Sequence, residues 1–584
     1  MKRTDIIKGI EDRMMKRDID ILIIPTEDPH LSEYPAQHWK LRQLISGFTG
    51  SNGLLILSKF GNGLWTDSRY FLQAEEELKG TNIIMYKDTE SDWLSWLEKV
   101  PQGSRIAING LCFSQVTVEK LEALCQSNHC SLETHFVLPE ENELPPLPCS
   151  DLFIHDSSYE GRSFQEKKAV VFQKCSAHYL LLAALDEIAW AFNLRASDIE
   201  FNPMPIAYAL LGKQESHLFL CNLQLDKSVA QYFADNNINV HSYDETFDFV
   251  SSVSLKNTIS ADAEKSNHTL YNSVQKEHLV REKSPIEQLK GIKSASEIRC
   301  IENAELKDGI ALTHAFVEIS ERIEKRQTTT EREISTILLK HRSAQDGFFC
   351  ESFSTIAGYG SNGAIVHYNA EHGSNALIGK ESLLLVDSGA NYLDGTTDIT
   401  RVFCFGEPTE QQKKDYTAVL KGHIAIATCR FPYGTEGAHI DALARQFLWQ
   451  EGLDYGHGTG HGIGFFLCVH EGPQRINRRF SGVKLEEGMI LSDEPGIYRT
   501  NQYGIRIENM VAVEKYKESE FGKFLQFKTL TLFPYERKLI LKDLLTQKEI
   551  DWINQYHQRV YNAIVTHLSD EREIMWLKNV TKEL

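Results

Sequence analysis

Five side chains of the kinds that bind metals are spread over the last third of the sequence. They are Asp387 in LLLVDSGA, Asp398 in TTDITR, His461 in GTGHGIG, Glu494 in SDEPG and Glu508 in IRIENM. Four carboxylates and one imidazole form a hard, oxygen-rich ligand set, which suits two divalent cations that share a bridging carboxylate and a bridging water. Each residue stands at an expected strand end, in a turn or beside glycine, where a side chain is held rigidly while a substrate approaches.

The apolar surroundings of three carboxylates favour metal binding over a solvated turn. Asp387 ends a run of Leu and Val, Asp398 lies inside an apolar strand, and Glu508 follows Ile507. An isolated Asp is more often a solvated turn residue, but a buried carboxylate needs a cation or strong donors. Arg401 and Arg506 are close enough in sequence to support these carboxylates.

Three further histidines are candidates for handling substrate and protons. His457 and His461 have the spacing of zinc-binding helices, but GHGTGHGIG predicts a loop, because glycine costs roughly 1 kcal/mol per helical position. His367 in AIVHYNA and His470 in LCVHEGP stand beside apolar strands. Taken singly, each is better read as a hydrogen-bonded structural histidine. As a set with His457 they become candidate catalytic groups.

A GxGxxG pattern at Gly358, Gly360 and Gly363 imitates a dinucleotide-binding fingerprint. That fingerprint requires a helix directly after the last glycine. Here AIVHYNAEHGSN follows, which predicts strand-like and then turn-like structure. We therefore interpret the glycines as a loop.

Composition excludes several classes of protein. The formal net charge of −19 argues against nucleic acid as a main partner. No apolar run is long enough to span a membrane, and the charged N-terminus has no signal-peptide pattern. The eleven cysteines are irregularly spaced, which fits a reducing compartment. These features predict a cytoplasmic protein.

The chain divides into three expected segments. With ~150 residues per domain, 584 residues suggest three or four domains. We predict α/β domains over 1–145 and 150–285, separated by LPEENELPPLP (138–148), because its four prolines break helices and central strands. The second domain is suspected to resemble the first. The third, 286–584, begins with a long helix and continues with strands and glycine turns.

Local patterns predict the elements of these segments. In the first, IDILIIP is an expected buried strand, GLLILSKFGNGLWTD two strands around a turn, and RYFLQAEEEL a helix. In the second, a helix is expected over roughly 163–177 and strands at SHLFLCN and NTISAD. In the third, SLLLVDSG and TTDITRVFCF resemble a hairpin in which Asp387 faces Asp398. GIRIENMVAV alternates as one strand, with Arg506 and Glu508 on one face.

The ordered series VDSGA, TTDITR, GTGHGIG, DEPG and IRIEN resembles the pita-bread metallopeptidases, which include methionine aminopeptidase, prolidase and aminopeptidase P. AIVHY, VHEGP, WTDSRYFLQA, ALDEIAWAFNLR and LTQKEIDWINQYH extend the resemblance to the long three-domain cytosolic aminopeptidase P. The resemblance implies two creatinase-type N-terminal α/β domains followed by a C-terminal pita-bread catalytic domain with a helical extension.

The resemblance also implies roles for all eight positions. Asp387 would chelate one metal, His461 and Glu494 the other, and Asp398 and Glu508 would bridge both. His367, His457 and His470 would surround the substrate, and Glu494 would pass a proton to the leaving nitrogen. The implied cofactors are two divalent cations, Mn²⁺ in the first place, with Zn²⁺ or Co²⁺ as alternatives. The implied assembly is a homodimer.

The implied activity is hydrolysis of the N-terminal Xaa-Pro bond of peptides whose second residue is proline. A prolidase-type Xaa-Pro dipeptidase would use the same metals, with a pocket that closes on the carboxylate of a dipeptide. A non-catalytic binding module on this fold is the alternative from another class. That alternative predicts lost ligands, whereas all five are present in this sequence.

Overall fold

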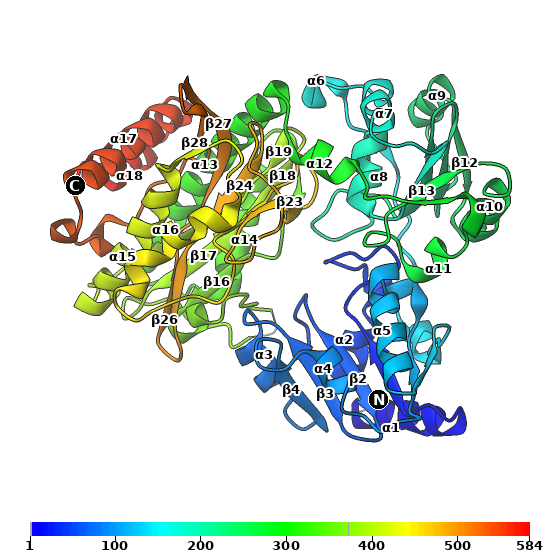
Figure 1. Ribbon diagram of the computed structural model, residues 1–584. Helices are drawn as coiled ribbons and strands as arrows, with labels where there is room; N and C mark the ends of the chain where they lie inside the picture. The colour runs from blue at the N-terminus through cyan, green and yellow to red at the C-terminus, as the bar shows by residue number, and fades with distance from the viewer. Residues whose placement is uncertain (1–2, 372) are drawn as a thin grey trace. The chain divides into compact units, whose positions relative to one another are not determined.

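A computed structural model describes residues 3–371 and 373–584 of the chain, which form two compact units. One unit contains residues up to 157 together with 162–287, and the other contains 158–161 and 288–584. The first unit holds the blue-to-green part of Figure 1 and the second the green-to-red part. The candidate metal ligands all belong to the second unit.

The N-terminal half of the first unit is a six-stranded mixed sheet in the order β4-β3-β2-β1-β5-β6. Its strands are β1 (Ile21–Ile24), β2 (Leu54–Ser58), β3 (Asn62–Thr66), β4 (Ile83–Lys87), β5 (Arg105–Ala107) and β6 (Ser131–Glu133). Its α-helices are α1 (Arg3–Lys16), α2 (Leu41–Ser46), α3 (Phe71–Glu77), α4 (Trp93–Leu97) and α5 (Gln115–Ser127). The predicted strands around the Gly-Asn-Gly turn and the helix after them are therefore present.

A second six-stranded sheet in the same unit has the order β12-β11-β10-β8-β13-β14. Its strands are β8 (Tyr179–Leu182), β10 (Ala207–Gly212), β11 (Ser216–Leu220), β12 (Ile238–Ser242), β13 (Ile259–Ala261) and β14 (Leu279–Arg281). The other elements of this part are α6 (Ser157–Glu160), α7 (Phe164–Phe172), α8 (Leu185–Phe192), α9 (Lys227–Asp235), α10 (Thr246–Val253), α11 (His268–Tyr271), β7 (Phe153–Ile154) and β9 (Leu194–Arg195). The helix predicted over 163–177 is shorter than expected.

The two six-stranded sheets share one topology. In each sheet the first three strands in sequence order, β1-β2-β3 in one and β8-β10-β11 in the other, pair antiparallel. The other three pairings of each sheet are parallel. The suspected likeness of the second segment to the first is thus present in strand order and direction, although no sequence repeat reveals it.

The second unit surrounds small antiparallel sheets with helices. Its helices are α12 (Ile286–Gly291), α13 (Ala295–Glu324), α14 (Glu331–Ser343), α15 (Glu410–Ala427), α16 (Gly437–Trp449), α17 (Gln547–Ile564) and α18 (Glu571–Val580). Helix α13 is the predicted long helix, and Ser294 and Glu297 form a capping box at its start. Helices α14, α17 and α18 contact α13, and α15 packs on α16 (Figure 1).

Four sheets of the second unit carry the site. They are β16 (Ile356–Tyr359), β17 (Leu384–Ser388) and β20 (Ile399–Phe403); β15 (Phe348–Glu351), β18 (Ala390–Tyr392) and β19 (Gly395–Thr396); β25 (Gly496–Arg499) and β26 (Tyr503–Arg506); and a six-stranded sheet. The last contains β21 (Arg430–Pro432), β28 (Gly522–Thr529), β27 (Asn509–Ser519), β24 (Ile490–Asp493), β22 (Gly460–Gly462) and β23 (Glu471–Ile476), in that order.

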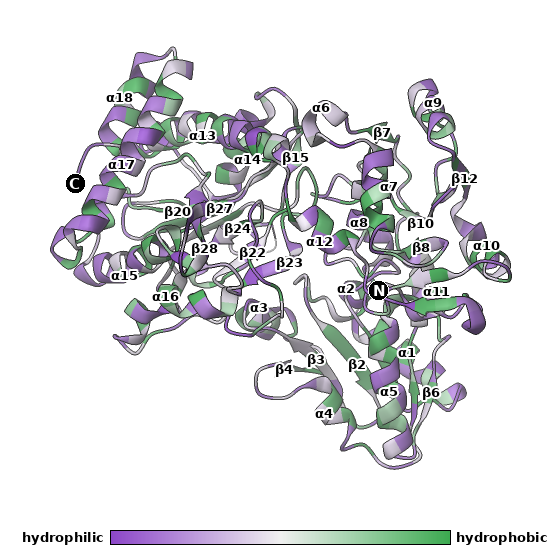
Figure 2. Ribbon diagram, turned by 45° about the horizontal axis from the view of Figure 1, so that its top comes forward, coloured by the Kyte–Doolittle hydropathy of each residue, from purple (hydrophilic) through white to green (hydrophobic). Residues whose placement is uncertain are grey.

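The hydropathy of strands and helices differs in the way that their burial requires. Strand β2 is green along its length in Figure 2, whereas α17 and α18 alternate between purple and green. The alternation is typical of helices that bury one face. Ile550, Ile553, Tyr556, Val560 and Ile564 form that face of α17 and belong to one hydrophobic core cluster of the second unit.

Two local predictions about strands need correction. Strands β17 and β20 pair antiparallel, but they are not a simple hairpin, because the chain between them forms β18 and β19 in another sheet. GIRIENMVAV is not one strand. It breaks at residues 507–508 into β26 and β27, which belong to different sheets. Alternation in a sequence indicates faces of a strand but cannot reveal that the chain changes sheets.

The GxGxxG pattern begins inside a strand, at Gly358, and no α-helix follows its last glycine over the described residues 364–371. Strand β16 ends at Tyr359, and a short 3-10 helix, η6 (Gly360–Ala364), contains two of the three glycines. Residues 365–371 form turns rather than the expected strand-like segment. The α-helix that a dinucleotide-binding fingerprint requires is therefore missing from this described stretch, but the glycines do not form a simple loop, because Gly358 lies in β16 and the other two lie in η6. No helix among the described residues is long and apolar enough to cross a membrane.

Candidate metal centre

Strand ends of the second unit present the five predicted ligands. Asp387 lies in β17 one residue before its end, and Asp398 lies directly before β20. Glu494 follows β24, Glu508 precedes β27, and His461 is the middle residue of β22. A strand end fixes the backbone on one side while leaving the side chain free to face a ligand, so the local structure matches the expectation.

Register and one backbone hydrogen bond bring the two sheets together. Asp387 pairs with Thr400 in the β17–β20 ladder. The amide of Glu508 donates to the carbonyl of Thr400 at 3.2 Å, which joins this sheet to the start of β27 in the six-stranded sheet. The amide of Glu494 donates to the carbonyl of Thr459 at 2.8 Å, so the loop that carries His457 is tied to the same place.

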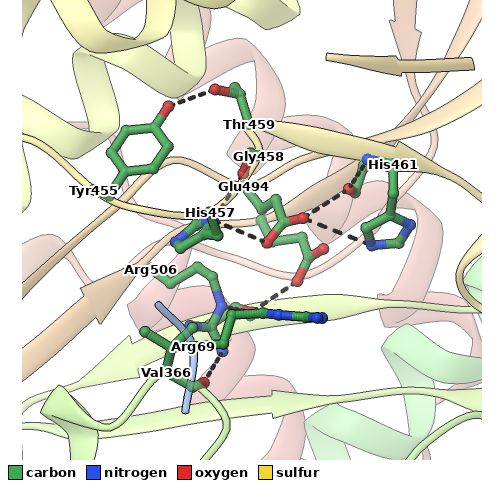
Figure 3. A network of polar contacts seen from close by, with 12 residues as sticks. Arg69, Val366, Tyr455, His457, Gly458, Thr459, His461, Glu494 and Arg506 are labelled. Carbon is green, nitrogen blue, oxygen red and sulfur yellow. Dashed lines mark hydrogen bonds and ion pairs between the residues drawn. The ribbon is translucent and has the colours of Figure 1, made fainter. Parts of the chain in front are cut away.

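Three of the five ligands form a close group. One ligand atom from each of Asp398, His461 and Glu508 lies within 4.8 Å of the others. His461 Nε2 is 3.4 Å from Asp398 Oδ2 and 3.7 Å from Glu494 Oε1, which brings the fourth ligand to the same imidazole. Figure 3 shows His461 and Glu494 pointing toward each other, with His457 on the other side of Glu494.

Asp387, the fifth predicted ligand, is hydrogen-bonded to Arg506. Its Oδ2 accepts a hydrogen bond from Arg506 Nη2 at 2.6 Å. Its Oδ1 is buried and has no hydrogen-bond partner among the described residues. A buried carboxylate oxygen without a donor is costly, and a cation would satisfy it.

Burial and crowding of negative charge raise the pKa values of three carboxyl groups. Burial raises the pKa of Asp387, although Arg506 opposes the shift. Burial also raises the pKa of Glu494, against the charge of His461. The pKa of Glu508 lies well above its ordinary value because burial adds to the charges of Asp398 and the other carboxylates. Four carboxylates and one guanidinium leave an excess of negative charge that divalent cations would neutralise.

His461 is arranged as a ligand through Nε2. Burial alone would lower its pKa, but the hydrogen bond with Asp398 and the charge of Glu494 raise the pKa to about 9. Its Nδ1 lies 2.9 Å from the carbonyl of Gly462, so Nδ1 carries a proton and donates. Loss of the Nε2 proton then leaves a lone pair facing Asp398 and Glu494, the form that binds a metal. The donor set fits two hard divalent cations.

Two of the other three histidines contact ligand residues, and the third lies beside a residue that contacts Arg506. The rings of His470 and His461 are 4.4 Å apart in an edge-to-face contact. His457 Nδ1 is 3.8 Å from Glu494 Oε2 and donates to the carbonyl of Gly458 at 2.7 Å. His367 lies in the turn after η6, next to Val366, whose carbonyl is 3.4 Å from Arg506 Nη2. His457 is in the predicted loop rather than on a helix.

A chain of hydrogen bonds connects Asp387 to His457 through two residues, one of which the sequence did not indicate. Arg506 Nη1 donates to the hydroxyl of Tyr498 at 2.6 Å. That hydroxyl then donates to His457 Nε2 at 2.8 Å. Arg506 was expected near the carboxylates, but Tyr498 carries no signal beyond its position two residues into β25. Arg401, the other expected partner, contacts no ligand carboxylate and instead bonds to backbone on the opposite face.

Comparisons with known families cover nearly the whole chain. Residues 299–515 match the profile described as metallopeptidase family M24, and residues 523–584 match that of the C-terminal region of the M24 peptidases. Residues 7–135 and 143–297 match two profiles described as creatinase/prolidase N-terminal domain. Each of these two matches contains one of the six-stranded sheets of the first unit.

Similar proteins extend over almost the same length. Probable Xaa-Pro aminopeptidase P from Coprinopsis cinerea is 38% identical over 98% of this chain and 97% of its own length. Aminopeptidase P2 from Arabidopsis thaliana is 36% identical over 97% of this chain and 86% of its own length. The crystal structure of X-prolyl aminopeptidase from Caenorhabditis elegans, titled a cytosolic enzyme with a di-nuclear active site, superposes with a TM-score of 0.92. It is 31% identical and covers 97% of this chain and 95% of that chain.

Proposed function

This chain belongs to the aminopeptidase P family of M24 metallopeptidases, and we propose that it releases the N-terminal residue from peptides whose second residue is proline. It is a hydrolase with two creatinase-type N-terminal domains and a pita-bread catalytic domain. The observation that supports the activity most directly is the convergence of Asp398, His461 and Glu508 within 4.8 Å, beside Glu494 and the buried Asp387.

We propose that these five residues hold two divalent cations. Asp387 would hold one, His461 and Glu494 the other, and Asp398 and Glu508 both. The position of Asp398 and Glu508 in the close group with His461 supports their shared role. When bound, two such cations lower the pKa of a water molecule and stabilise negative charge on the substrate carbonyl. We propose Mn²⁺ as the metal, because the family resemblance implies Mn²⁺ in the first place and extends over nearly the whole chain.

The protein's own side chains would bind the peptide and move protons. Glu494 lies next to His461 and His457, which suits it to take a proton and deliver it to the leaving proline nitrogen. His367, His457 and His470 would line the substrate and stabilise the tetrahedral intermediate. Proline requires this arrangement because its peptide nitrogen has no hydrogen and its ring fixes the backbone. A site that grips an N–H at the scissile bond cannot use proline.

Further proposals concern assembly, location and domain limits. We propose a homodimer, which follows from the family resemblance, and domain boundaries of 1–145, 150–285 and 286–584, which rest on the proline-rich stretch 138–148 and the local sequence patterns. We also propose that the protein works in the cytoplasm. The description of the C. elegans relative as cytosolic and the irregular cysteine spacing support that location. Light scattering coupled to size exclusion at several protein concentrations would test the dimer.

Matched peptides test the substrate proposal. We expect release of free Xaa from Xaa-Pro-Yaa peptides and poor cleavage of Xaa-Ala-Yaa, because a preformed pocket rewards the rigid ring. His457→Ala should lower kcat/KM for Xaa-Pro-Yaa by roughly 100-fold or more while both cations remain bound, because a proton-handling group is lost but no ligand. Equal cleavage of Ala and Pro peptides contradicts the proposal. Activity confined to Xaa-Pro dipeptides would support the prolidase alternative.

Counting bound metal tests the two-cation proposal. Asp398→Ala should remove a ligand shared by both cations, so mass spectrometry of the purified variant should find fewer than two per chain. Peptide hydrolysis should disappear while the circular dichroism spectrum stays that of the wild type. A chelator should abolish wild-type activity, and manganese should restore it. Full activity in metal-stripped protein excludes the proposed centre.

A further inference from the structure

Arg401 lies on the face of β20 opposite to the carboxylates. Successive residues of a strand point to opposite faces, so Thr400 faces Asp387 and Glu508 while Arg401 faces away. Its side chain is buried, with 2% of the residue exposed. A buried guanidinium needs a partner for every N–H group, because an unsatisfied charged donor is costly.

One side of the Arg401 guanidinium binds the two chain segments that carry the candidate shared ligands. Nη1 donates to the carbonyl of Glu508 at 2.6 Å and to that of Thr400 at 2.9 Å. Nη2 donates to Asn509 Oδ1 at 2.8 Å. Arg401 thus bridges the backbone of Thr400, two residues beyond Asp398, to the backbone of Glu508 itself.

The other side of the guanidinium binds the C-terminal region. Nε donates to the carbonyl of Pro534 at 3.1 Å, and Nη2 donates to that of Phe533 at 2.7 Å. Nη2 also donates to the hydroxyl of Tyr556 on α17 at 3.1 Å. That hydroxyl lies 2.9 Å from the carbonyl of Phe533 and 3.1 Å from that of Thr531, which share its single proton. The guanidinium lies 4.6 Å from the ring centre of Tyr535.

A second connection from the C-terminal region reaches β24, which ends at Asp493, directly before Glu494. Asn509 Nδ2 donates to the hydroxyl of Tyr535 at 2.8 Å. The same hydroxyl is 2.9 Å from His423 Nε2, and His423 Nδ1 is 3.1 Å from the carbonyl of Asp493. The residues directly beside Glu494 and Glu508 are therefore both linked to Tyr535.

We propose that Arg401 is a positioning residue for the metal centre and that residues 523–584 contribute to metal binding through it. The proposal rests on the two-cation function above. Two shared carboxylates must keep a fixed separation to address the same pair of cations. Each stands at a strand end in a different sheet, and one backbone hydrogen bond, from the amide of Glu508 to the carbonyl of Thr400, connects the two strands. Arg401 holds these two strands together from the face opposite to the carboxylates, and its hydrogen bonds to the C-terminal region fix the position of the guanidinium.

A purely structural role makes a different prediction. If Arg401 only stabilised the fold, its loss would lower the unfolding temperature without changing the metal affinity of the protein that remains folded. If it positions ligands, metal affinity falls even in folded protein, because partners of ligating groups typically contribute 10- to 100-fold to affinity. Arg401→Lys keeps the charge but cannot bridge two carbonyls and an amide at once, so it should recover only part of the affinity.

The test is calorimetric titration of Mn²⁺ into the metal-stripped full-length chain, with circular dichroism to establish that each variant is folded. We expect Arg401→Met to lower the affinity for at least one cation by about 10- to 100-fold. Tyr556→Phe removes one hydroxyl from the anchor and should lower it by a smaller factor, roughly threefold or more. The matched control is Tyr561→Phe, which also lies on α17 and packs at the edge of the same core.

The outcomes separate this proposal from the proposed function. If wild-type protein binds two cations and both Arg401→Met and Tyr556→Phe bind them within about twofold of wild-type affinity, the positioning role is wrong while the metal centre stands. If the wild type does not bind two cations, the proposed centre itself fails. Should Arg401→Met not fold, Tyr556→Phe against Tyr561→Phe decides, and unchanged affinity in Tyr556→Phe overturns the proposal.

Discussion

The hydroxyl of Thr400 donates a hydrogen bond to Oε2 of Glu508 at 2.7 Å, across the junction of two sheets. Thr400 in turn accepts a hydrogen bond from Arg506 Nε at 3.1 Å. The hydroxyl therefore uses its single proton on the carboxylate and is oriented by the guanidinium. The hydrogen bond fixes the orientation of Oε2 of Glu508. The remaining lone pairs of the carboxylate are then available to bind cations.

Thr400→Val should lower metal affinity about tenfold, because it removes this hydrogen bond and keeps the shape of the side chain. Peptide hydrolysis at limiting Mn²⁺ should fall, and a higher Mn²⁺ concentration should restore much of it. The measurement is activity against free Mn²⁺ concentration. Thr400→Ser, which keeps the hydroxyl, is the control and should need little more metal than the wild type. Identical metal requirements in all three proteins would refute the orienting role.

Stability of the metal-free protein should fall as the pH rises from 6.5 to about 9. The pKa of His461 is raised from 6.5 to about 9, and those of Asp387, Glu494 and Glu508 are also raised. Each group holds its proton to higher pH when folded than when unfolded, so the folded state binds more protons. The stabilisation by these protons is present at low pH and is lost as pH rises through the folded-state pKa values.

Thermal unfolding in a chelator and in excess Mn²⁺ checks this pH dependence. With metal the slope should reverse, because protons compete with cations for the same ligands. The pH range from 6.5 to about 9 avoids a contribution from buried His30 and His557. Their pKa values are lowered to about 4, so their protonation differs between the folded and unfolded states only below about pH 6.5. A chelated protein whose unfolding temperature rises between pH 6.5 and 9 would contradict the electrostatic description of the site.

Glu494→Gln should reduce kcat far more than substrate affinity. The amide cannot accept a proton, so a contribution specific to the transition state is lost. Steady-state kinetics with saturating Mn²⁺ and parallel metal counting separate this loss from simple loss of a ligand. Glu487→Gln, on an exposed side chain that pairs with Lys523, is the control. Activity within about threefold of the wild type, or only about 0.7 kcal/mol in barrier, would exclude a proton-transfer role.

Glu471→Gln should destabilise the second unit by about 3 kcal/mol, the scale of breaking a buried ion pair. Its carboxylate lies 2.8 Å from Lys290 Nζ and 2.6 Å from Lys293 Nζ, and all three side chains are almost fully buried. The change leaves two buried ammonium groups without their counter-charge. Because Glu471 follows His470, kcat/KM should fall as well.

Urea unfolding followed by circular dichroism measures the effect of Glu471→Gln. The control is loss of the Lys523–Glu487 pair, whose side chains are 37% and 52% exposed and which should contribute less than about 1 kcal/mol. Equal unfolding midpoints for the Glu471 and Glu487 variants would show that the buried cluster carries no special share of stability.

The types of the candidate ligands and their order were readable from the sequence, because chemistry and local pattern suffice for both. Apolar runs mark the strands before Asp387 and after Glu508, and glycines around His457 and His461 exclude a helix. The long helix α13 followed from its apolar spacing, and the structure shows that Ser294 and Glu297 cap its start. Local structure of this kind depends on residues close together in the chain.

Only the tertiary structure decided which of these residues meet and what holds them. Asp387 pairs with Arg506, and Tyr498 links Arg506 to His457, across separations that no periodicity encodes. The break after Arg506 sends β26 and β27 into different sheets, although the sequence alternates without interruption. Arg401 turns away from the carboxylates because it is adjacent to Thr400 in β20. A period of two assigns a residue to a face, but packing determines what that face meets.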